Sequence, residues 1–143
     1  MKEDKIYLVQ TNTTVGFLSQ NLSKLNEIKK RDKNKKFLKV VSGFELLARI
    51  PKKHKKRVRR TPNKNTYIIK NEAYRVILEP HHREFLKKFK WMYSSSANEN
   101  GKNFDEKFAI NNADILVIDE RDYFESTPSK IYKLSKNKIK RLR

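Results

Sequence analysis

The sequence predicts a mixed domain of the α/β or α+β class, built on a twisted mixed β-sheet with flanking helices. Short apolar runs alternate along the chain with segments of helical spacing, which is the order expected of such a sheet. Two of the runs, 65–70 and 73–78, are separated only by Asn71 and Glu72, which indicates a hairpin. The 143 residues contain three glycines, no internal repeat and no linker, so we expect one domain that spans residues 1–143.

The first elements are predicted from apolar spacing and from capping residues. Segment 5–10, KIYLVQ, has the composition of a buried strand, and a polar turn follows it. Segment 19–31 carries leucine and isoleucine at near-helical spacing and ends in cations, as helix C-termini often do. Segment 36–41 is a second predicted strand. The next residues, 42–45, place serine three residues before glutamate, a capping box that predicts a short helix.

The later elements follow the same logic. Pro80 stands at a plausible first helical position, so we expect a helix over 80–89. A second, shorter helix is predicted over 103–110. The remaining predicted strands occupy 90–95, 114–119, 129–134 and 137–143.

Positive charge is the strongest compositional signal. The chain has 35 Lys and Arg against 16 Asp and Glu, a formal net charge of +19. Segments 49–60 and 130–143 are rich in cations and contain no acid. Such a field attracts polyanions, including RNA, nucleotides and acidic membranes. The alternative is a surface that lysine simply keeps solvated, and for the tail both interpretations stay open.

Several classes of protein are excluded. The chain has no cysteine, so it has neither disulfides nor a thiolate zinc site. No apolar run approaches the ~20 residues that span a bilayer, and no signal peptide is visible. His81 and His82 are adjacent, point to different sides of a helix and have no acidic cluster nearby, so we expect no metal site. We therefore expect a cytoplasmic protein with no membrane partner.

Polar clusters occur at predicted strand ends and turns, and they appear in a recognisable order. They are QTNTTVG at 10–16, KKRDKNKKF at 29–37, AYR at 73–75, SSSANENG at 94–101 and STPSKIYKL at 126–134. Their order and content resemble the YrdC family, the threonylcarbamoyl-adenylate synthases of tRNA modification. The resemblance implies a YrdC-like twisted mixed sheet with flanking helices around a basic cavity.

The resemblance extends over nearly the whole chain. The family's Pro-Thr-(Asp/Glu)-Thr-(Val/Ser)-Tyr-Gly-Leu motif corresponds to 10–17, and its Lys-x-Arg signature to Lys29-Lys30-Arg31. Its Val-Arg-x-Pro arginine corresponds to Arg75. Its Ser-x-Asn signature corresponds to 96–98, and its Pro-Ser-Thr-Ile motif to 128–131. Each piece is weak alone, and specificity lies in the ordered set.

The family's reaction condenses L-threonine, bicarbonate and ATP into threonylcarbamoyl-AMP and pyrophosphate. The product is the donor for N6-threonylcarbamoyladenosine in tRNA. No covalent enzyme intermediate is implied, so the protein binds, orients and neutralises charge. ATP would be a substrate, Mg²⁺ would arrive with the nucleotide, and downstream tRNA-modification proteins would be partners.

The resemblance also implies site residues. Residues expected to hold ATP are Lys29, Arg31, Lys35, Asn98 and Arg141. Residues expected to hold threonine are Thr13, Arg75, Ser96 and Ser129. Arginine's planar fork suits carboxylate and phosphate oxygens, while lysine supplies a mobile point charge.

Local structural roles compete with these assignments. Lys29 and Arg31 could serve only as cations at a helix C-terminus. The segment 94–98 could cap the helix that follows it, and Thr13 could be an ordinary turn hydroxyl. Arg75 could face solvent from a strand.

The chain also departs from the family pattern. Gln10 replaces a proline, Asn12 replaces an acid, and Asn63-Lys64 replaces a Gly-Pro pair. These changes affect loop shape more than charge. A second hypothesis is therefore a non-catalytic protein that binds tRNA or double-stranded RNA with the same basic cavity. Segment 49–60 and the tail would then contact phosphates.

Overall fold

The computed structural model describes residues 3–30, 37–47, 49–60 and 64–143. The strands are β1 (Tyr7–Gln10), β2 (Val15–Ser19), β3 (Leu38–Val41), β4 (Asn65–Ile69), β5 (Glu72–Val76), β6 (Trp91–Ser96), β7 (Ile115–Leu116), β8 (Lys130–Leu134) and β9 (Ile139–Arg141). The helices are α1 (Leu22–Lys29), α2 (Lys55–Arg60), α3 (Pro80–Lys87) and α4 (Glu106–Asn112), with 3-10 turns η1 (Phe44–Leu46) and η2 (Lys52–His54).

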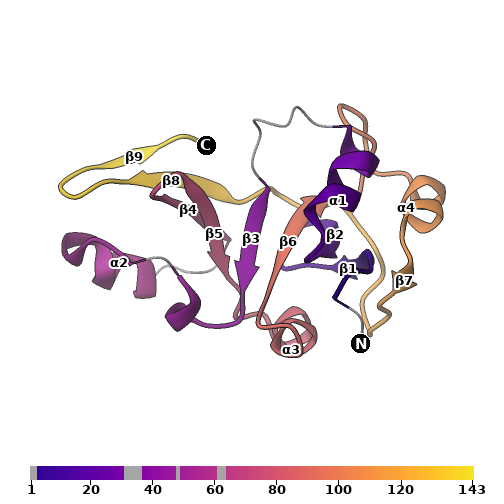
Figure 1. Cartoon of the computed structure of the whole chain (residues 1–143), viewed down its shortest axis with the longest axis horizontal. Helices are drawn as coiled ribbons and strands as arrows, with labels where there is room; N and C mark the ends of the chain where they lie inside the picture. The colour runs from indigo at the N-terminus through magenta and orange to yellow at the C-terminus, as the bar shows by residue number, and fades with distance from the viewer. Residues whose placement is uncertain (1–2, 31–36, 48, 61–63) are drawn as a thin grey trace.

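All of these strands belong to one twisted sheet that runs along the length of the molecule (Figure 1). Their order is β7-β1-β2-β6-β3-β5-β4-β8-β9. The pairs β1–β7, β3–β5 and β4–β8 are parallel, and the other neighbours are antiparallel. This architecture confirms the predicted mixed α/β fold.

Strand register divides the sheet into two faces. Leu38 lies opposite Ser94 on β6, and Ser94 in turn lies opposite Leu18 on β2, so these side chains share one face. Val40 pairs with Arg75 on the same face. We call this the front face and the other side the back face.

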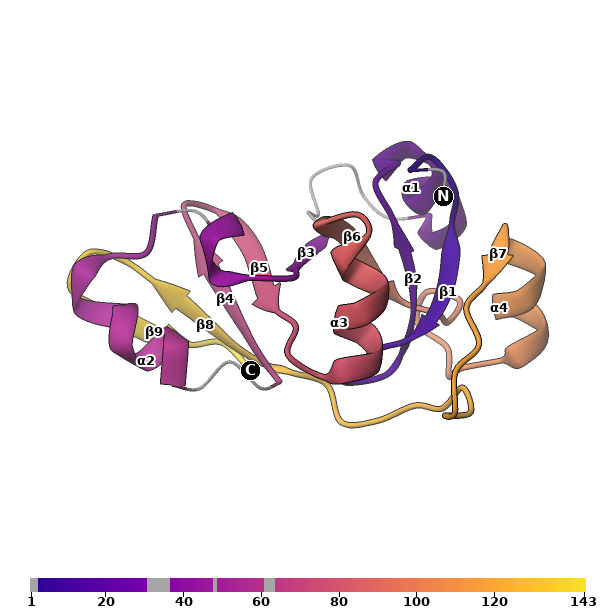
Figure 2. The same cartoon turned by 90° about the horizontal axis from the view of Figure 1, so that it is seen from below.

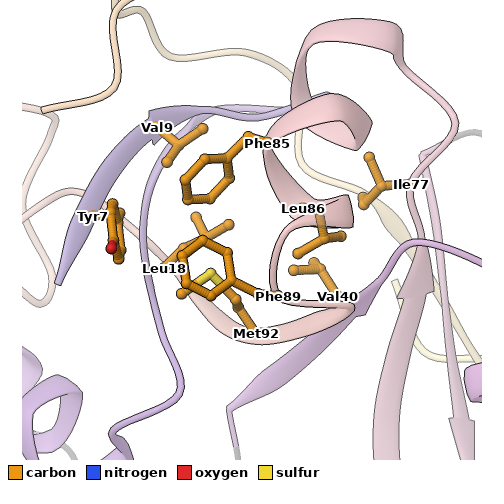
Figure 3. Close-up of a cluster of buried hydrophobic side chains, with 9 residues drawn as sticks. All are labelled: Tyr7, Val9, Leu18, Val40, Ile77, Phe85, Leu86, Phe89 and Met92. Carbon is orange, nitrogen blue, oxygen red and sulfur yellow. The ribbon is translucent and has the colours of Figure 1, made fainter. Parts of the chain in front are cut away.

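Helix α3 covers one part of the front face (Figure 2). Phe85 of α3 and Phe89, just after the helix, pack with Tyr7 of β1, and the three ring centroids lie 5.3–5.4 Å apart. Figure 3 shows these rings with Leu18 and Met92 between the helix and the sheet. The rest of the front face has no helix over it among the described elements.

The back face is covered at both ends. Leu25 of α1 and Ala109 of α4 pack with Leu8 and Phe17 over the β1–β2 end of the sheet. Val58 of α2 packs with a second buried cluster over the β4–β8 end. No helix in the described part of the chain is long and apolar enough to cross a membrane.

The start of α3 agrees with the prediction at Pro80, which occupies the first turn. The Glu79 carboxylate caps this helix by accepting the backbone N–H groups of His81 and His82 at 3.1 and 2.7 Å. Burial alone would raise the pKa of Glu79. The hydrogen bonds from these two residues outweigh burial, and the net pKa lies below the ordinary value.

Two predictions near the N-terminus were wrong. Val15 and Gly16 were expected in a polar turn and Ser19 in a helix, but Val15–Ser19 is the interior strand β2. Its glycine and terminal serine weaken the strand signal, whereas pairing with β1 and β6 on both sides fixes it. The helix predicted over 19–31 therefore begins at Leu22, where the Asn21 side chain accepts the Lys24 N–H.

Other boundaries also shifted. The β4–β5 turn is centred on Lys70 and Asn71, one residue earlier than predicted, and both residues have positive φ (51° and 65°), as a two-residue hairpin turn requires. The strand predicted over 114–119 keeps only Ile115–Leu116. The capping box predicted at 42–45 is a 3-10 turn without a side-chain cap.

His82 of α3 is completely buried. Neither of its ring nitrogens has a hydrogen-bond partner among the described residues. Burial, reinforced by the positive charge of Arg75, lowers the pKa of His82 to about 3. The ring is therefore neutral in the folded protein at every pH above that value.

This burial predicts acid sensitivity well above pH 3. Unfolded His82 takes a proton near its ordinary pKa of 6.5, while the folded ring does not, so the free energy of unfolding falls as pH drops below 6.5. We expect His82 to account for a loss of about 2 kcal/mol between pH 7 and pH 5. Urea unfolding of the wild type and His82→Leu at both pH values measures it. An identical pH dependence in the two proteins would contradict the assignment.

Candidate functional site

A cavity of about 390 Å³ opens on the part of the front face that α3 does not cover. Its lining comes from the turn between β1 and β2, from strands β2 to β6 and from the segment that leads into β8. Hydroxyl-bearing residues dominate this lining: Thr11, Thr13, Thr14, Thr66, Ser94, Ser95, Ser96 and Ser129. No acidic residue lines the cavity within the described chain.

Arg75 of β5 is the buried cation of this cavity, with 7% of its surface exposed. Its Nε donates to Thr66 Oγ1 at 3.1 Å, one Nη donates to Thr13 Oγ1 at 3.1 Å, and the other donates to Ser129 Oγ at 2.8 Å. Thr66 and Ser129 are themselves joined by a 2.7 Å hydrogen bond. The guanidinium is thus fixed by hydroxyls from three separate segments.

The charge of Arg75 is not neutralised by any carboxylate in the part of the chain that the structure describes. Burial, and then the positive charge of Arg143, lowers the pKa of Arg75 to about 10, so the group stays charged at neutral pH. Arg143 lines the same cavity and donates to the Ser129 carbonyl at 2.9 Å. A buried cation beside a second cation is stabilised by an anion. The geometry therefore suits a carboxylate or a phosphate.

The turn between β1 and β2 brings its hydroxyls to the cavity by local hydrogen bonds. Thr11 Oγ1 accepts the backbone N–H of Thr13 at 3.1 Å and lies 3.2 Å from its hydroxyl. Gly16, at the start of β2, allows close approach of the neighbouring strand. A Cβ there would stand 3.0 Å from the Ser95 carbonyl oxygen and 3.2 Å from Thr11 Cγ2.

Arg121 anchors this turn through hydrogen bonds to backbone carbonyls. Its Nη2 donates to the Gln10 carbonyl at 2.9 Å and its Nη1 to the Thr11 carbonyl at 3.4 Å. The same guanidinium forms salt bridges to Glu79 at 3.2 Å and to Asp119 at 2.6 Å. The hydrogen bond from Arg121 keeps the pKa of Asp119 below its ordinary value. One side chain thus ties the turn to the start of α3.

Lys29 lies beside the cavity and holds the end of β6. It is buried, and its ammonium donates to the carbonyls of Ser96 at 2.9 Å and Asn98 at 2.6 Å. Asn98 borders a second hollow of about 250 Å³, which shares Thr14 and Ser96 with the first. Lys29 therefore positions the loop between the two hollows.

The structure brings together the residues expected to hold threonine. Thr13, Arg75, Ser96 and Ser129 all line the one cavity. The residues expected to hold ATP are more dispersed. Asn98 lines the neighbouring hollow and Lys29 donates to the Asn98 carbonyl, whereas Arg141 is exposed and does not line the cavity. Arg31 and Lys35 lie outside the described residues.

The structure also adds residues that the sequence did not single out. Arg143, and not Arg141, reaches the cavity, because Arg143 follows the end of β9 and donates to the Ser129 carbonyl, whereas Arg141 stays exposed within the strand. Thr66 lies in segment 61–69, which resembles the family segment that contains the Gly-Pro pair, but the sequence assigned it no role. Arg121 lies in no motif, and only the chain path places it. No group of three or more His, Cys, Asp or Glu residues that could hold a metal ion occurs in the described ranges.

Comparison with known proteins gives few sequence relatives. No family model matches the chain. The "Uncharacterized protein MG259 homolog" of Mycoplasma pneumoniae is 26% identical over 142 residues, covering 94% of this chain and 31% of that protein. The chain thus spans about a third of that relative.

Solved structures share the fold. Sua5 from P. abyssi complexed with L-threonine has a TM-score of 0.79 at 16% identity, covering 97% of this chain and 50% of that one. YciO from E. coli has a TM-score of 0.79 at 13% identity, covering 98% and 82%. HypF in its phosphate- and nucleotide-bound form has a TM-score of 0.74 at 13% identity, covering 97% and 26%. At such identities the likeness shows the fold alone.

The contacts of Arg121 with Glu79, Asp119 and the turn carbonyls, together called the Arg121 clamp, should stabilise the fold. In Arg121→Ala the Glu79 and Asp119 carboxylates lose their shared cation, and two turn carbonyls lose their donor. We expect a loss of about 1–3 kcal/mol in the free energy of unfolding, measured by urea denaturation. Arg83→Ala is the control, because the Arg83 side chain in α3 makes a single, long hydrogen bond among the described residues, to the Ser42 carbonyl at 3.3 Å. Equal losses in the two variants would contradict the clamp.

Proposed function

We propose that this chain, which has the YrdC-like fold, is an L-threonylcarbamoyladenylate synthase. It would condense L-threonine, bicarbonate and ATP into threonylcarbamoyl-AMP and pyrophosphate, for the modification of tRNA adenosine. One observation carries the proposal: Arg75 is buried in a hydroxyl-lined cavity and has no carboxylate partner among the described residues.

Threonine fits the chemistry of this cavity. Its carboxylate would accept a charge-assisted pair of hydrogen bonds from Arg75, with Arg143 adding positive charge at the rim. Its hydroxyl and amine would meet the side chains of Thr13, Ser96 and Ser129. A volume of about 390 Å³ lies within the usual range for small-ligand sites. The L-threonine complex of Sua5, a protein of the same fold, supports this ligand.

The proposed reaction needs positioning more than reactive side chains. The threonine amine adds to the carbon of bicarbonate, water leaves, and a carbamate forms. A carbamate oxygen then attacks the α-phosphorus of ATP, the bond to the β-phosphate oxygen breaks, and pyrophosphate departs. Every reactant carries negative charge, so fixed cations lower the repulsion between them.

The nucleotide would lie beside the threonine, toward the second hollow. Asn98 and the loop held by Lys29 border that hollow. Arg31, Lys35 and Arg141 remain proposed contacts. Mg²⁺ would be bound by the phosphates with few protein ligands.

Arg75→Gln tests the threonine site. Glutamine keeps hydrogen-bonding capacity but removes the charge, so L-threonine affinity should fall by about 1.5–3 kcal/mol, roughly 10- to 150-fold, in calorimetric titration. Arg83→Gln removes a cation outside the cavity and should bind threonine like the wild type. Unchanged affinity in Arg75→Gln would contradict the assignment.

Turnover is tested separately. Pyrophosphate release from ATP should require L-threonine, bicarbonate and Mg²⁺ together, and it should be lost in Arg75→Gln. Threonine binding without pyrophosphate release would contradict the synthase and leave a non-catalytic binding protein.

A further inference from the structure

A cavity of about 500 Å³ lies at the β4–β8 end of the sheet and has no part in the proposed reaction. We call it the second cavity; it is distinct from the 250 Å³ hollow beside the first cavity. Ile69 and Leu134 form part of its lining and lie opposite each other on the back face. Thr66 and Ile131, which line the first cavity, pair in the same two strands but point to the front face. The two cavities are therefore on opposite sides of the sheet.

Five cations surround this second cavity: Arg49, Lys52, Lys55, Lys70 and Lys136. They come from three places, namely the segment around η2, the β4–β5 turn and the β8–β9 turn. No acid lines the cavity, and none of the five forms a salt bridge within the described ranges. Their mutual repulsion is unfavourable in the free protein, and a bound polyanion removes it.

The walls of the cavity are fixed by contacts other than the cations that line it. The buried His54 ring lies 2.8 Å from the Ser135 carbonyl, and Lys53 donates to the Asn137 carbonyl at 3.2 Å. These bonds attach η2 to the β8–β9 turn. Ile50 and Val58 are buried beneath the basic segment with Ile69 and Leu134. The site is thus preformed, with an apolar floor and a cationic rim.

We propose that this second cavity, with the surface around it, binds the phosphodiester backbone of a nucleic acid strand. Exposed cations continue beyond the rim on α2 and in the β8–β9 turn: Lys56, Arg59 and Lys138. Figures 1 and 2 show α2 and the β8–β9 hairpin together at one end of the molecule. A single small anion neutralises only part of this charge, whereas a strand with one phosphate per nucleotide follows it.

The floor of the cavity distinguishes a nucleic acid from a membrane. None of the large hydrophobic residues exposed in the described structure lines the cavity or lies within 49–60. A membrane-binding surface needs such residues to enter the acyl region. The apolar floor is recessed, and it suits a ribose or base that enters while its phosphates remain on the rim.

The test uses Lys55→Gln/Lys70→Gln/Lys136→Gln, with one substitution from each wall. The probes are a tRNA transcript and a single-stranded DNA of matched length. Fluorescence anisotropy measures the binding affinity for each probe across a salt series. We expect both affinities to fall by at least about tenfold near 0.1 M salt. The slope of log K against log salt should decrease in magnitude by about 2, since each lost phosphate contact contributes about 0.7.

A variant of equal charge is the control. Lys87→Gln/Lys88→Gln/Lys107→Gln removes three exposed lysines from α3 and α4, away from both cavities. Its affinity and slope should stay close to wild type. Equal effects in the two variants would overturn the proposal, because the binding would then follow net charge alone. The proposal is also overturned if the wall variant binds both probes normally but loses affinity for poly-L-glutamate or for phosphatidylglycerol vesicles.

The proposal stands apart from the synthase function. The wall variant should bind L-threonine like the wild type, because its substitutions lie on the opposite face of the sheet from Arg75. Failure of threonine binding in the wild type would refute the proposed function without affecting nucleic acid binding.

Discussion

Burying a guanidinium without a carboxylate partner is unfavourable in free energy, and the residues on the front face of this sheet compensate for it with hydrogen bonds. Arg75 is held by the hydroxyls of Thr13, Thr66 and Ser129, which satisfy three of its five N–H donors and leave its charge in place. Those hydroxyls come from the first turn, a central hairpin and the segment before β8. The position of one cation therefore requires that distant parts of the chain are correctly paired.

The coverage of the sheet explains where that cation can be used. Helices pack on the back face at both ends, whereas α3 alone packs on the front face among the described elements. The uncovered part of the front face becomes a cavity, because most of the residues that line it are small or hydroxylated. Lys29 and Arg121 then fix its borders from α1 and from the loop before β8. Packing and site geometry are thus two aspects of one arrangement.

Much of the fold could be predicted from local sequence patterns. The residues proposed to hold threonine were identified from ordered motifs at strand ends. Apolar runs located β1 and β6, and Pro80 located α3. The strand β2 was missed because its sequence is locally ambiguous and its identity comes from partners far along the chain. The choice between Arg141 and Arg143 depends on the path of the chain after β9, which motif spacing does not settle. That the chain is a single domain remains a prediction.

The parallel pairing of β4 with β8 has a consequence for the order of events during synthesis. Ser129 and Arg143 reach the cavity only through this pairing, and they belong to the last part of the sequence given. While residues after β7 are still inside the ribosome, Arg75 lacks the Ser129 hydroxyl, and one wall of the first cavity is missing. A nascent chain can therefore pair β1 to β6 with one another before the cavity is complete, and its last wall forms only when β8 and β9 emerge.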